Sequence, residues 1–185
     1  MTTPSKPAAT VILIRHDLKI LLMRRSKKAS FFPSAWVFPG GRVDEADQNV
    51  TCYGDIDGLK DNHFAVAAIR ECFEEAGIPT SLADQAVAVG ISSYTMEVDE
   101  GLRRHAFFIY DLDVPSEFRP QPVDGEVAEF NLMAVDQVAA IVRQGQAFKF
   151  NCNLVLIDYF VRTGMITPDD ADYFRIVTGL HPALP

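Results

Sequence analysis

A crowded set of glutamates in residues 70–78, RECFEEAGI, constrains the fold of this chain more than any other feature. The stretch carries helix-forming residues and ends at Gly77, as is typical of the position that follows a helix. On a helix, Glu71, Glu74 and Glu75 share one face, because they stand at i, i+3 and i+4. Like charges at this spacing repel one another by about a few tenths of a kcal/mol per pair. A bound cation reverses the sign of that interaction, so the pattern predicts a cation site on this helix.

The other side chains of this helix, over residues 63–77, predict a second, apolar face. At about 100° per residue, the apolar residues gather opposite the glutamates: Ala65, Ile69, Cys72 and Ala76, with Val66 and Phe73 close to them. The small residues Ala67 and Ala68 flank the acids and leave room for a close approach to the helix. Arg70, four residues before Glu74, is placed to orient or partly neutralise that carboxylate. We therefore expect one face on the core and one face of carboxylates.

The rest of the chain predicts strands before and after this helix, and further helices at the end. The strand segments are a hairpin over 9–26 with its turn at 16–19, and the segments 35–38, 86–96, 103–114 and 127–133. Residues 42–62 read as loop, and helices are expected over 135–145 and 151–164. A last helix is expected to begin at Thr167 as N-cap with Pro168 at N1. This order predicts one α+β domain over residues 1–185, with helices packed on a mixed central sheet.

Composition argues against several classes of function. A net charge of −8 is unlike a duplex nucleic-acid binder, which usually has a basic patch, but it leaves room for a small anionic substrate held by a metal ion. Apolar runs such as VILI are too short to span a bilayer, and residues 1–10 lack the pattern of a signal peptide. The three cysteines include no C-x-x-C pair, so neither a disulfide framework nor a zinc site is indicated. We expect a cytoplasmic protein without a membrane segment.

Three carboxylates on one helix face are hard oxygen ligands of the kind that Mg²⁺ and Mn²⁺ prefer. Upstream, the Pro-Gly-Gly turn at residues 39–41 allows the backbone to come close to a ligand, and a glycine carbonyl there is able to complete a metal shell. Each pattern alone has a plainer explanation, namely a solvated helix face and an ordinary turn. Their combination favours the metal site.

Residues 41–78 resemble the signature of the Nudix hydrolases. That signature reads Gly, five residues, Glu, seven residues, then Arg-Glu-U-x-Glu-Glu-x-Gly-U, where U is apolar. The second half is complete here, from Arg70 to Ile78. In the first half, Gly41 is followed after five residues by Asp47 in place of Glu, and 22 residues instead of seven separate Asp47 from Arg70. The signature thus carries an insertion, at residues 48–62, which leaves the role of Asp47 open.

The resemblance implies a Nudix-type α/β/α sandwich with a catalytic loop-helix-loop, and a hydrolase that cleaves a diphosphate linked to another moiety. It implies that Glu74 and Glu75 bind Mg²⁺ or Mn²⁺ with the Gly40 carbonyl nearby. Glu71 is then a further metal ligand or the base, and Arg70 orients the acids. In such a reaction the metal neutralises phosphate oxygens and lowers the pKa of the attacking water.

Many members of the family take one more acid from a loop outside the helix. The candidates in this chain are Glu97, Asp99, Glu100, Asp124, Glu126 and Glu129. We favour Glu126, in DGEVAEF just before an expected strand, as a catalytic residue. A solvated turn acid is the alternative reading of the same residue.

Basic and aromatic residues suggest where a substrate binds. Arg24 and Arg25 open the basic run RRSKK, and Arg104 stands with Arg103 at the start of an aromatic strand, so these side chains are candidates for binding phosphate. Solvated basic turns are the alternative explanation. The aromatic residues Phe31, Phe32, Trp36 and Tyr94 are able to stack on a ring, although aromatics at these spacings also suit a core.

Two partial resemblances point to different substrates. The segment FFPSAWVFPGGRVDEAD and the insertion after it are similar to coenzyme A diphosphatases of the Nudix family, whereas DGEVAEFNLMAVDQV and the segment from residue 148 onward, with helices over 150–185, resemble Nudix proteins of thiamine diphosphate metabolism. The substrate expected is a nucleoside-diphosphate-linked or related small molecule, and these resemblances add a thiamine diphosphate derivative and coenzyme A as candidates. A Nudix-fold sensor that binds its ligand without cleaving it is the alternative, and a homodimer is compatible with both.

Overall fold

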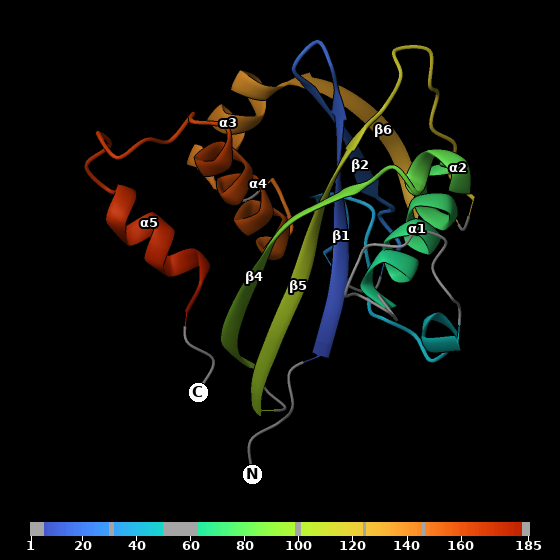
Figure 1. Cartoon of the computed structure of the whole chain (residues 1–185), viewed down its shortest axis with the longest axis horizontal. Helices are drawn as coiled ribbons and strands as arrows, with labels where there is room; N and C mark the ends of the chain where they lie inside the picture. Colours follow the sequence, from blue (N-terminus) through green and yellow to red (C-terminus); the bar gives the residue numbers. More distant parts are fainter. Residues whose placement is uncertain are drawn as a thin grey trace.

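The computed structural model of the protein (Figure 1) describes residues 6–29, 32–49, 63–98, 101–123, 125–145 and 147–182. Its elements, in chain order, are β1 (Lys6–Arg15), β2 (Lys19–Arg25), β3 (Trp36–Val37), the short 3-10 helix η1 (Ala46–Asn49), α1 (His63–Ala76), α2 (Thr80–Ala83), β4 (Val87–Val98), β5 (Gly101–Asp113), β6 (Val127–Ala134), α3 (Val135–Gln144), α4 (Phe150–Arg162) and α5 (Tyr173–Leu180). The predicted hairpin, the later strands and the helices over α1, α3 and α4 are confirmed.

The strands form one mixed sheet, as the sequence predicted. The order is β3-β2-β1-β5-β4, and β6 pairs with β2. β1 and β5 are parallel, whereas the other strand pairs are antiparallel. β1 pairs with β2 over three residue pairs only. Along the rest of that edge, β1 forms backbone hydrogen bonds with the segment that follows β3. There Ala9 N donates to Gly41 O and Val11 N donates to Pro39 O, both at 2.9 Å.

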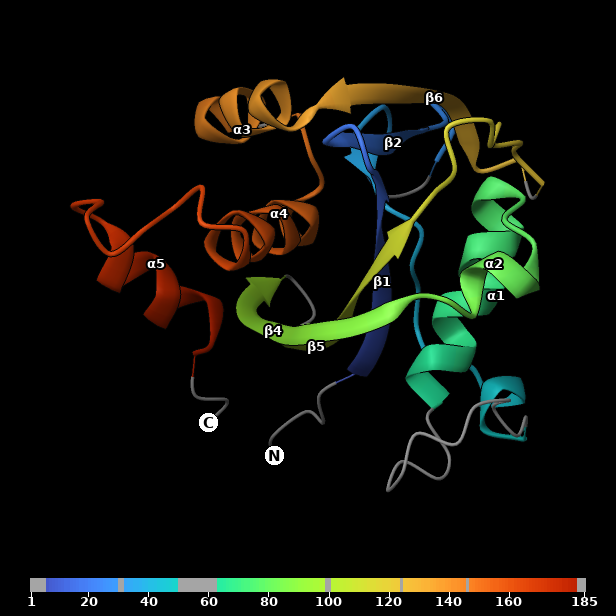
Figure 2. The same cartoon turned by 45° about the horizontal axis from the view of Figure 1, so that its top comes forward.

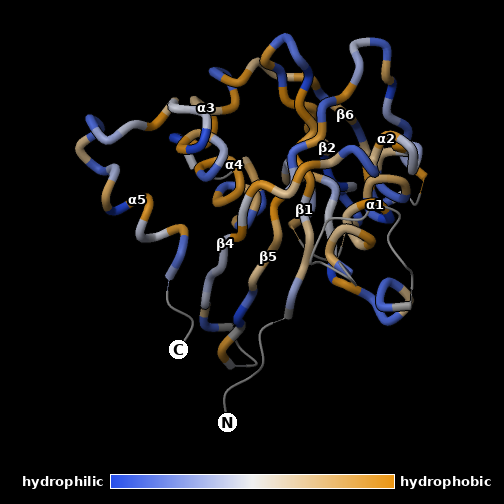
Figure 3. The backbone as a smooth tube through the Cα atoms, viewed as in Figure 1, coloured by the Kyte–Doolittle hydropathy of each residue, from blue (hydrophilic) through white to orange (hydrophobic). Residues whose placement is uncertain are grey.

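Helices cover both faces of the sheet. Val11, Ile12 and Leu13 are consecutive residues of β1 with no exposed surface. Since successive side chains of a strand point to opposite faces, this strand must be covered on both sides. Figure 2 shows α1 and α2 on one side of the sheet and α3, α4 and α5 on the other, and Figure 3 shows apolar residues concentrated along the central strands. The α/β/α arrangement expected from the sequence is confirmed.

The last helix begins later than the sequence predicted. Thr167 and Pro168 do not start it, because residues 167–170 close a separate turn: Asp170 N donates to Thr167 O at 2.9 Å, and Thr167 N donates to Asp170 Oδ2 at 2.7 Å. The Thr167 hydroxyl, which would have to accept a backbone N–H to cap a helix, instead donates to Asp170 Oδ2 at 3.4 Å. Helix α5 starts at Tyr173.

Most of the predicted insertion at 48–62 lies outside the described residues, which include only its first two positions, within η1. In the described part of the chain, none of the helices has both the length and the apolar character needed to cross a bilayer.

Candidate functional site

The carboxylate helix α1 is rotated from the orientation that its apolar pattern predicted. Its buried residues are Ala67, Ala68, Cys72, Glu75 and Ala76, whereas Phe73, expected close to the core, is 51% exposed. The small side chains of Ala67 and Ala68 let α1 pack closely on strand β1 of the sheet. As a result the three signature glutamates differ in exposure: the side chain of Glu74 is 47% exposed and that of Glu71 is 14% exposed, while Glu75 is buried.

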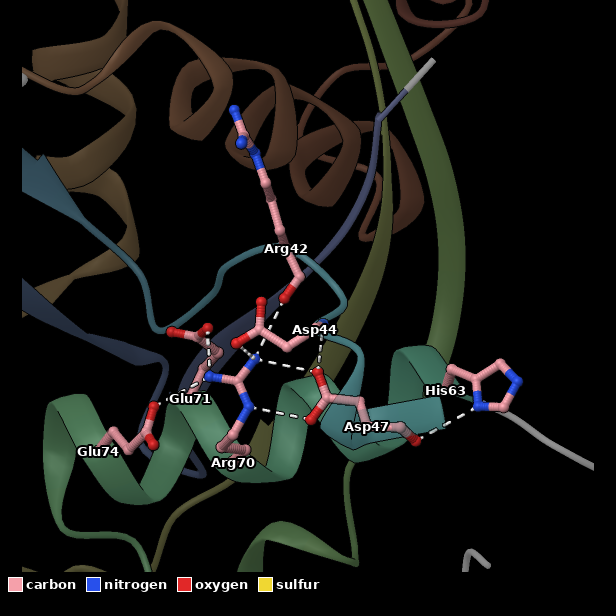
Figure 4. Close-up of polar contacts among 7 residues, drawn as sticks. All are labelled: Arg42, Asp44, Asp47, His63, Arg70, Glu71 and Glu74. Atoms are coloured by element: carbon pink, nitrogen blue, oxygen red, sulfur yellow. Dashed lines mark hydrogen bonds and ion pairs between the residues drawn. The ribbon is translucent and has the colours of Figure 1, made fainter. Parts of the chain in front are cut away.

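Arg70 stands at the centre of a network of acids (Figure 4). Its Nη1 donates to Glu71 Oε1 at 2.8 Å and to Glu74 Oε2 at 2.9 Å. Its Nε and Nη2 donate to the two carboxylate oxygens of Asp47 at 2.9 and 3.1 Å. Nη2 also donates to the carbonyl of Arg42, whose own side chain points away from the cluster. The role that the sequence assigned to Arg70, orienting the acids, has a geometric basis in these contacts.

Asp47 is the partner that the sequence left uncertain. Its side chain is buried and also accepts a hydrogen bond from Asp44 N at 2.7 Å. Burial by itself would raise the pKa of Asp47, but the hydrogen bonds from Arg70 and from the Asp44 backbone outweigh it, and the pKa is lowered. Asp47 is therefore held as a carboxylate, and it joins the loop after β3 to helix α1.

Glu75 is tied to the Pro-Gly-Gly turn. Gly40 N donates to Glu75 Oε2 at 3.0 Å. The neighbouring carbonyls of Pro39 and Gly41 both accept hydrogen bonds from β1, so residues 39 and 41 face β1 and residue 40 faces the other way. In extended backbone the N–H and C=O of one residue point to the same side. The Gly40 carbonyl, which accepts no hydrogen bond from the described residues, is thus directed to the Glu75 side.

Both glycines of the turn lie in close contact with other residues. A Cβ on Gly41 would overlap the Glu71 carboxylate, and a Cβ on Gly40 would lie 2.5 Å from Ala9 O and 2.8 Å from Thr10 Cα. Burial raises the pKa of Glu71, although Arg70 opposes that shift. Glu71 is therefore in close contact with the turn, and the pKa of its carboxyl is raised, in contrast to that of Asp47.

A cavity of about 480 Å³ opens beside this turn. Gly40, Gly41 and Glu75 line one part of it, and Lys149 with the first residues of α4 lines another. Ring side chains of β4, β5 and α4 form one wall of the cavity. Tyr94 stacks on His105 with ring centroids 5.3 Å apart, and it contacts Phe150 edge-on at 5.2 Å. The cavity is of the size that holds small-molecule ligands.

The three arginines proposed for substrate binding have different surroundings. Arg25 lines the cavity. Arg24, the residue before it in β2, lies over the Trp36 ring at 5.5 Å and pairs with Glu129 at 3.0 Å. Arg104 is not among the residues that line the cavity, and its buried Nε has no hydrogen-bond partner in the described part of the chain.

Of the loop acids, Glu126 pairs with Arg25, with 3.1 Å between Glu126 Oε2 and Arg25 Nη2. Glu97 lies exposed near the end of β4. Asp99, Glu100 and Asp124 are outside the described residues, as is Phe31. The sequence interpretation missed Lys149 and His105, because nothing in their local patterns connects them with the glutamates.

No three or more His, Cys, Asp or Glu side chains among the described residues are gathered as a set of metal ligands. Glu71 and Glu74 both accept hydrogen bonds from Arg70, and Glu75 accepts one from Gly40 N. The donor chemistry nevertheless fits Mg²⁺ or Mn²⁺, because these are carboxylate oxygens with a backbone carbonyl beside them.

Comparisons with known proteins agree with this geometry. The model of the NUDIX domain matches residues 4–152. Two relatives from Arabidopsis thaliana, named Nudix hydrolase 20, chloroplastic and Nudix hydrolase 24, chloroplastic, are 44% and 47% identical over 114 residues, or 61% of this chain. The matched region is 30% and 31% of those proteins, so the chain spans less than a third of their length.

Solved structures show the same fold at low identity. A NUDIX hydrolase from Alicyclobacillus acidocaldarius superposes with a TM-score of 0.63 at 17% identity, over 98% of this chain and all of that one. The NUDIX domain of Shewanella oneidensis NrtR, complexed with ADP ribose, gives a TM-score of 0.59 at 14% identity, over 89% of this chain and 91% of that one. The signature helix, the glycine turn packed against it and the family match lead to one conclusion: this chain belongs to the Nudix hydrolase family.

Proposed function

We propose that this chain is a divalent-metal-dependent hydrolase that cleaves a diphosphate bond in a small molecule. The observation that carries the proposal is the 3.0 Å hydrogen bond from Gly40 N to Glu75. It holds a carboxylate of α1 against the glycine turn at the edge of the cavity. Glu74, Glu75 and the Gly40 carbonyl would hold Mg²⁺ or Mn²⁺, with Glu71 as a further ligand. Bound there, the metal supplies neutralisation of phosphate oxygens and an acidified water.

The protein's own residues divide the remaining work. Arg70 holds Glu71 and Glu74 in fixed positions through one nitrogen, so the metal would meet a preorganised pair of acids. Glu71 is the candidate base if it does not bind the metal, because the raised pKa of its buried carboxyl increases its affinity for a proton. Glu126, the loop acid favoured from the sequence, does not line the cavity itself but pairs with Arg25, which does.

The organic part of the substrate would lie along the aromatic wall that contains Tyr94. Thiamine-type diphosphates and coenzyme A remain the two substrate classes put forward, each from its own partial resemblance. Cytoplasmic location and homodimer formation likewise remain predictions, and the two plant relatives are named chloroplastic.

A ligand-binding module without turnover is the second candidate. One observation favours it: the described acids are engaged with Arg70 and Gly40 and form no gathered ligand set. Such a module would bind a diphosphate compound in the same cavity and leave it intact.

A mass-spectrometric hydrolysis screen separates the two candidates. The panel contains nucleoside triphosphates, ADP-ribose, coenzyme A, thiamine diphosphate and oxothiamine diphosphate, each with Mg²⁺ or Mn²⁺. Glu75→Gln serves as the inactive variant and Glu117→Gln, at an exposed loop acid, as its matched control. Metal-dependent cleavage by the wild type and the control, absent in Glu75→Gln, supports the hydrolase. Binding of a panel member without cleavage supports the module.

A further inference from the structure

Two cations line the cavity beside the α1 acids, and the sequence put forward only the first of them for binding phosphate. They are Arg25, at the end of β2, and Lys149, just before α4. These residues are more than a hundred positions apart in the sequence, so only the fold brings them to one cavity.

Backbone hydrogen bonds anchor Arg25 and Lys149 to two consecutive residues, Ala35 and Trp36. Arg25 N donates to Ala35 O at 3.0 Å, and Lys149 N donates to Trp36 O at 3.1 Å. Four positions after Trp36, the same segment reaches Gly40 and its hydrogen bond with Glu75. Four residues of extended chain span about 14 Å at most. The backbone positions that hold Arg25 and Lys149 are therefore no farther from Gly40 and Glu75 than about the length of a small ligand.

The guanidinium of Arg25 has hydrogen-bonding capacity left over. Its side chain is 17% exposed, and Nη2 pairs with Glu126 Oε2 at 3.1 Å. Its Nε is buried and has no hydrogen-bond partner in the part of the chain that the structure describes. A buried donor without a partner is costly, and an anionic ligand oxygen would satisfy it.

Lys149 is partly buried and pairs with no carboxylate among the described residues. The thiol of Cys152, in the cavity wall, responds to the same charges. Burial raises its pKa to about 11, with Lys149 and Arg25 acting to lower it and Glu75 acting to raise it. The two cations and the acid therefore act on one stretch of the cavity wall.

The neighbouring ion pair provides a contrast. Arg24 of β2 and Glu129 of β6 are joined at 3.0 Å, but neither lines the cavity. Arg24 is occupied by Trp36 and by Ser34 O at 3.1 Å. The strand pairing shifts register between these two residues, and only Arg25 lines the cavity.

We propose that Arg25 and Lys149 form an anion subsite that binds a phosphate group of the substrate, and that Glu126 positions Arg25 instead of acting directly as a catalytic residue. The subsite rests on the proposed function only in taking the substrate to be a diphosphate. Its role is to hold phosphate oxygens from the protein side, while the α1 acids act from the metal side.

Calorimetric titration of inorganic pyrophosphate into the whole chain, in EDTA at fixed ionic strength, tests the subsite without turnover. Each charged hydrogen bond lost should weaken binding about tenfold or more, so Lys149→Gln and Arg25→Gln are both expected to show this loss. The control variant Lys28→Gln, in the same basic run but outside the cavity lining, should stay within about twofold of wild type. Circular dichroism confirms that each variant is folded, and Arg25→Lys replaces Arg25→Gln if the latter does not fold.

A double-variant comparison tests the role of Glu126. Glu126→Gln should weaken pyrophosphate binding in the wild-type background and have no further effect in the Arg25→Gln background, because it acts through Arg25. Glu129→Gln, which frees Arg24 instead, should leave binding unchanged. With any substrate found by hydrolysis screening, Glu126→Gln should raise KM and preserve kcat, whereas loss of a base would lower kcat.

The outcomes for the subsite and for the hydrolase are separate. Failure of the wild type to bind pyrophosphate, or equal binding by Lys149→Gln and wild type, overturns the subsite even if a substrate is hydrolysed. Selective loss of binding in the two cavity variants supports the subsite even if no panel compound is cleaved. A fall in kcat with unchanged KM in Glu126→Gln overturns the positioning role.

Discussion

Asp47 Oδ1 lies 2.9 Å from Arg70 Nε, although the two residues are 23 positions apart in the sequence. A second contact, 3.1 Å from Arg70 Nη2 to Asp47 Oδ2, makes the pair bidentate. The insertion that divides the Nudix signature thus leaves its two halves in contact. Arg70 in turn holds Glu71 and Glu74, so the loop after β3 and the carboxylate helix form one unit.

Asp47→Asn should lower the free energy of unfolding by about 2 kcal/mol at pH 7, because a buried carboxylate that pairs with Arg70 is replaced by a neutral amide. The pKa of Asp47 is lowered in the folded protein, so its contribution is present above the unfolded-state pKa of about 3.9. It is lost as the pH falls through the folded-state pKa. Urea unfolding at pH 7 and near pH 3 should show the gap between variant and wild type closing at the lower pH.

The control for this measurement is Asp169→Asn, an exposed acid, which should unfold like the wild type at both pH values. A gap for Asp47→Asn that stays constant with pH would show that its carboxylate charge is not what stabilises the loop.

The two glycines of the turn should respond differently to alanine. In Gly40→Ala the new Cβ meets backbone atoms of β1, which are unable to move aside, so thermal unfolding should reveal a loss of about 2 kcal/mol or more. In Gly41→Ala the Cβ meets the end of the Glu71 side chain, which is able to rotate. That variant should keep most of its stability and lose turnover. Gly179→Ala, with open space around its Cβ, is the control, and equal stabilities for the two turn variants would contradict this account.

Glu75→Gln should separate metal binding from folding. The glutamine side-chain oxygen is still able to accept the hydrogen bond from Gly40 N, so the free energy of unfolding should change by less than about 1 kcal/mol. The stabilisation of the wild type by Mn²⁺, measured as a shift in Tm, should disappear because a charged ligand is lost. An unchanged Mn²⁺ shift in the folded variant would remove Glu75 from the metal site.

Arg162 should be a determinant of stability away from the site. It joins Asp158 of α4, buried and 2.7 Å away, to Asp111 of β5 at 2.9 Å. Arg162→Met leaves the buried Asp158 without its cation, so a loss of about 3 kcal/mol is expected in urea unfolding. Arg175→Met, at an arginine that is 85% exposed and 3.8 Å from Asp172, should change stability by less than about 0.5 kcal/mol. Similar losses for the two variants would show that burial of Asp158 has little effect.

The sequence by itself determined the elements whose signals are local. The period of the apolar residues in α1, the run of β-branched residues in the first hairpin and the spacing of Glu71, Glu74 and Glu75 all depend on neighbours within a few positions. Such patterns identify a helix, a strand or a row of acids without knowledge of the rest of the chain. The α+β class and the family resemblance follow from them.

Only the tertiary structure decided how those elements face one another. Which side of α1 is buried depends on β1 and on the turn at residues 39–41, and their packing brought Glu75 inside and left Phe73 exposed. The same long-range pairing placed Arg25 and Lys149 on either side of β3. Contacts between residues far apart in the chain come from sheet register and packing, which leave no periodic trace in any one segment.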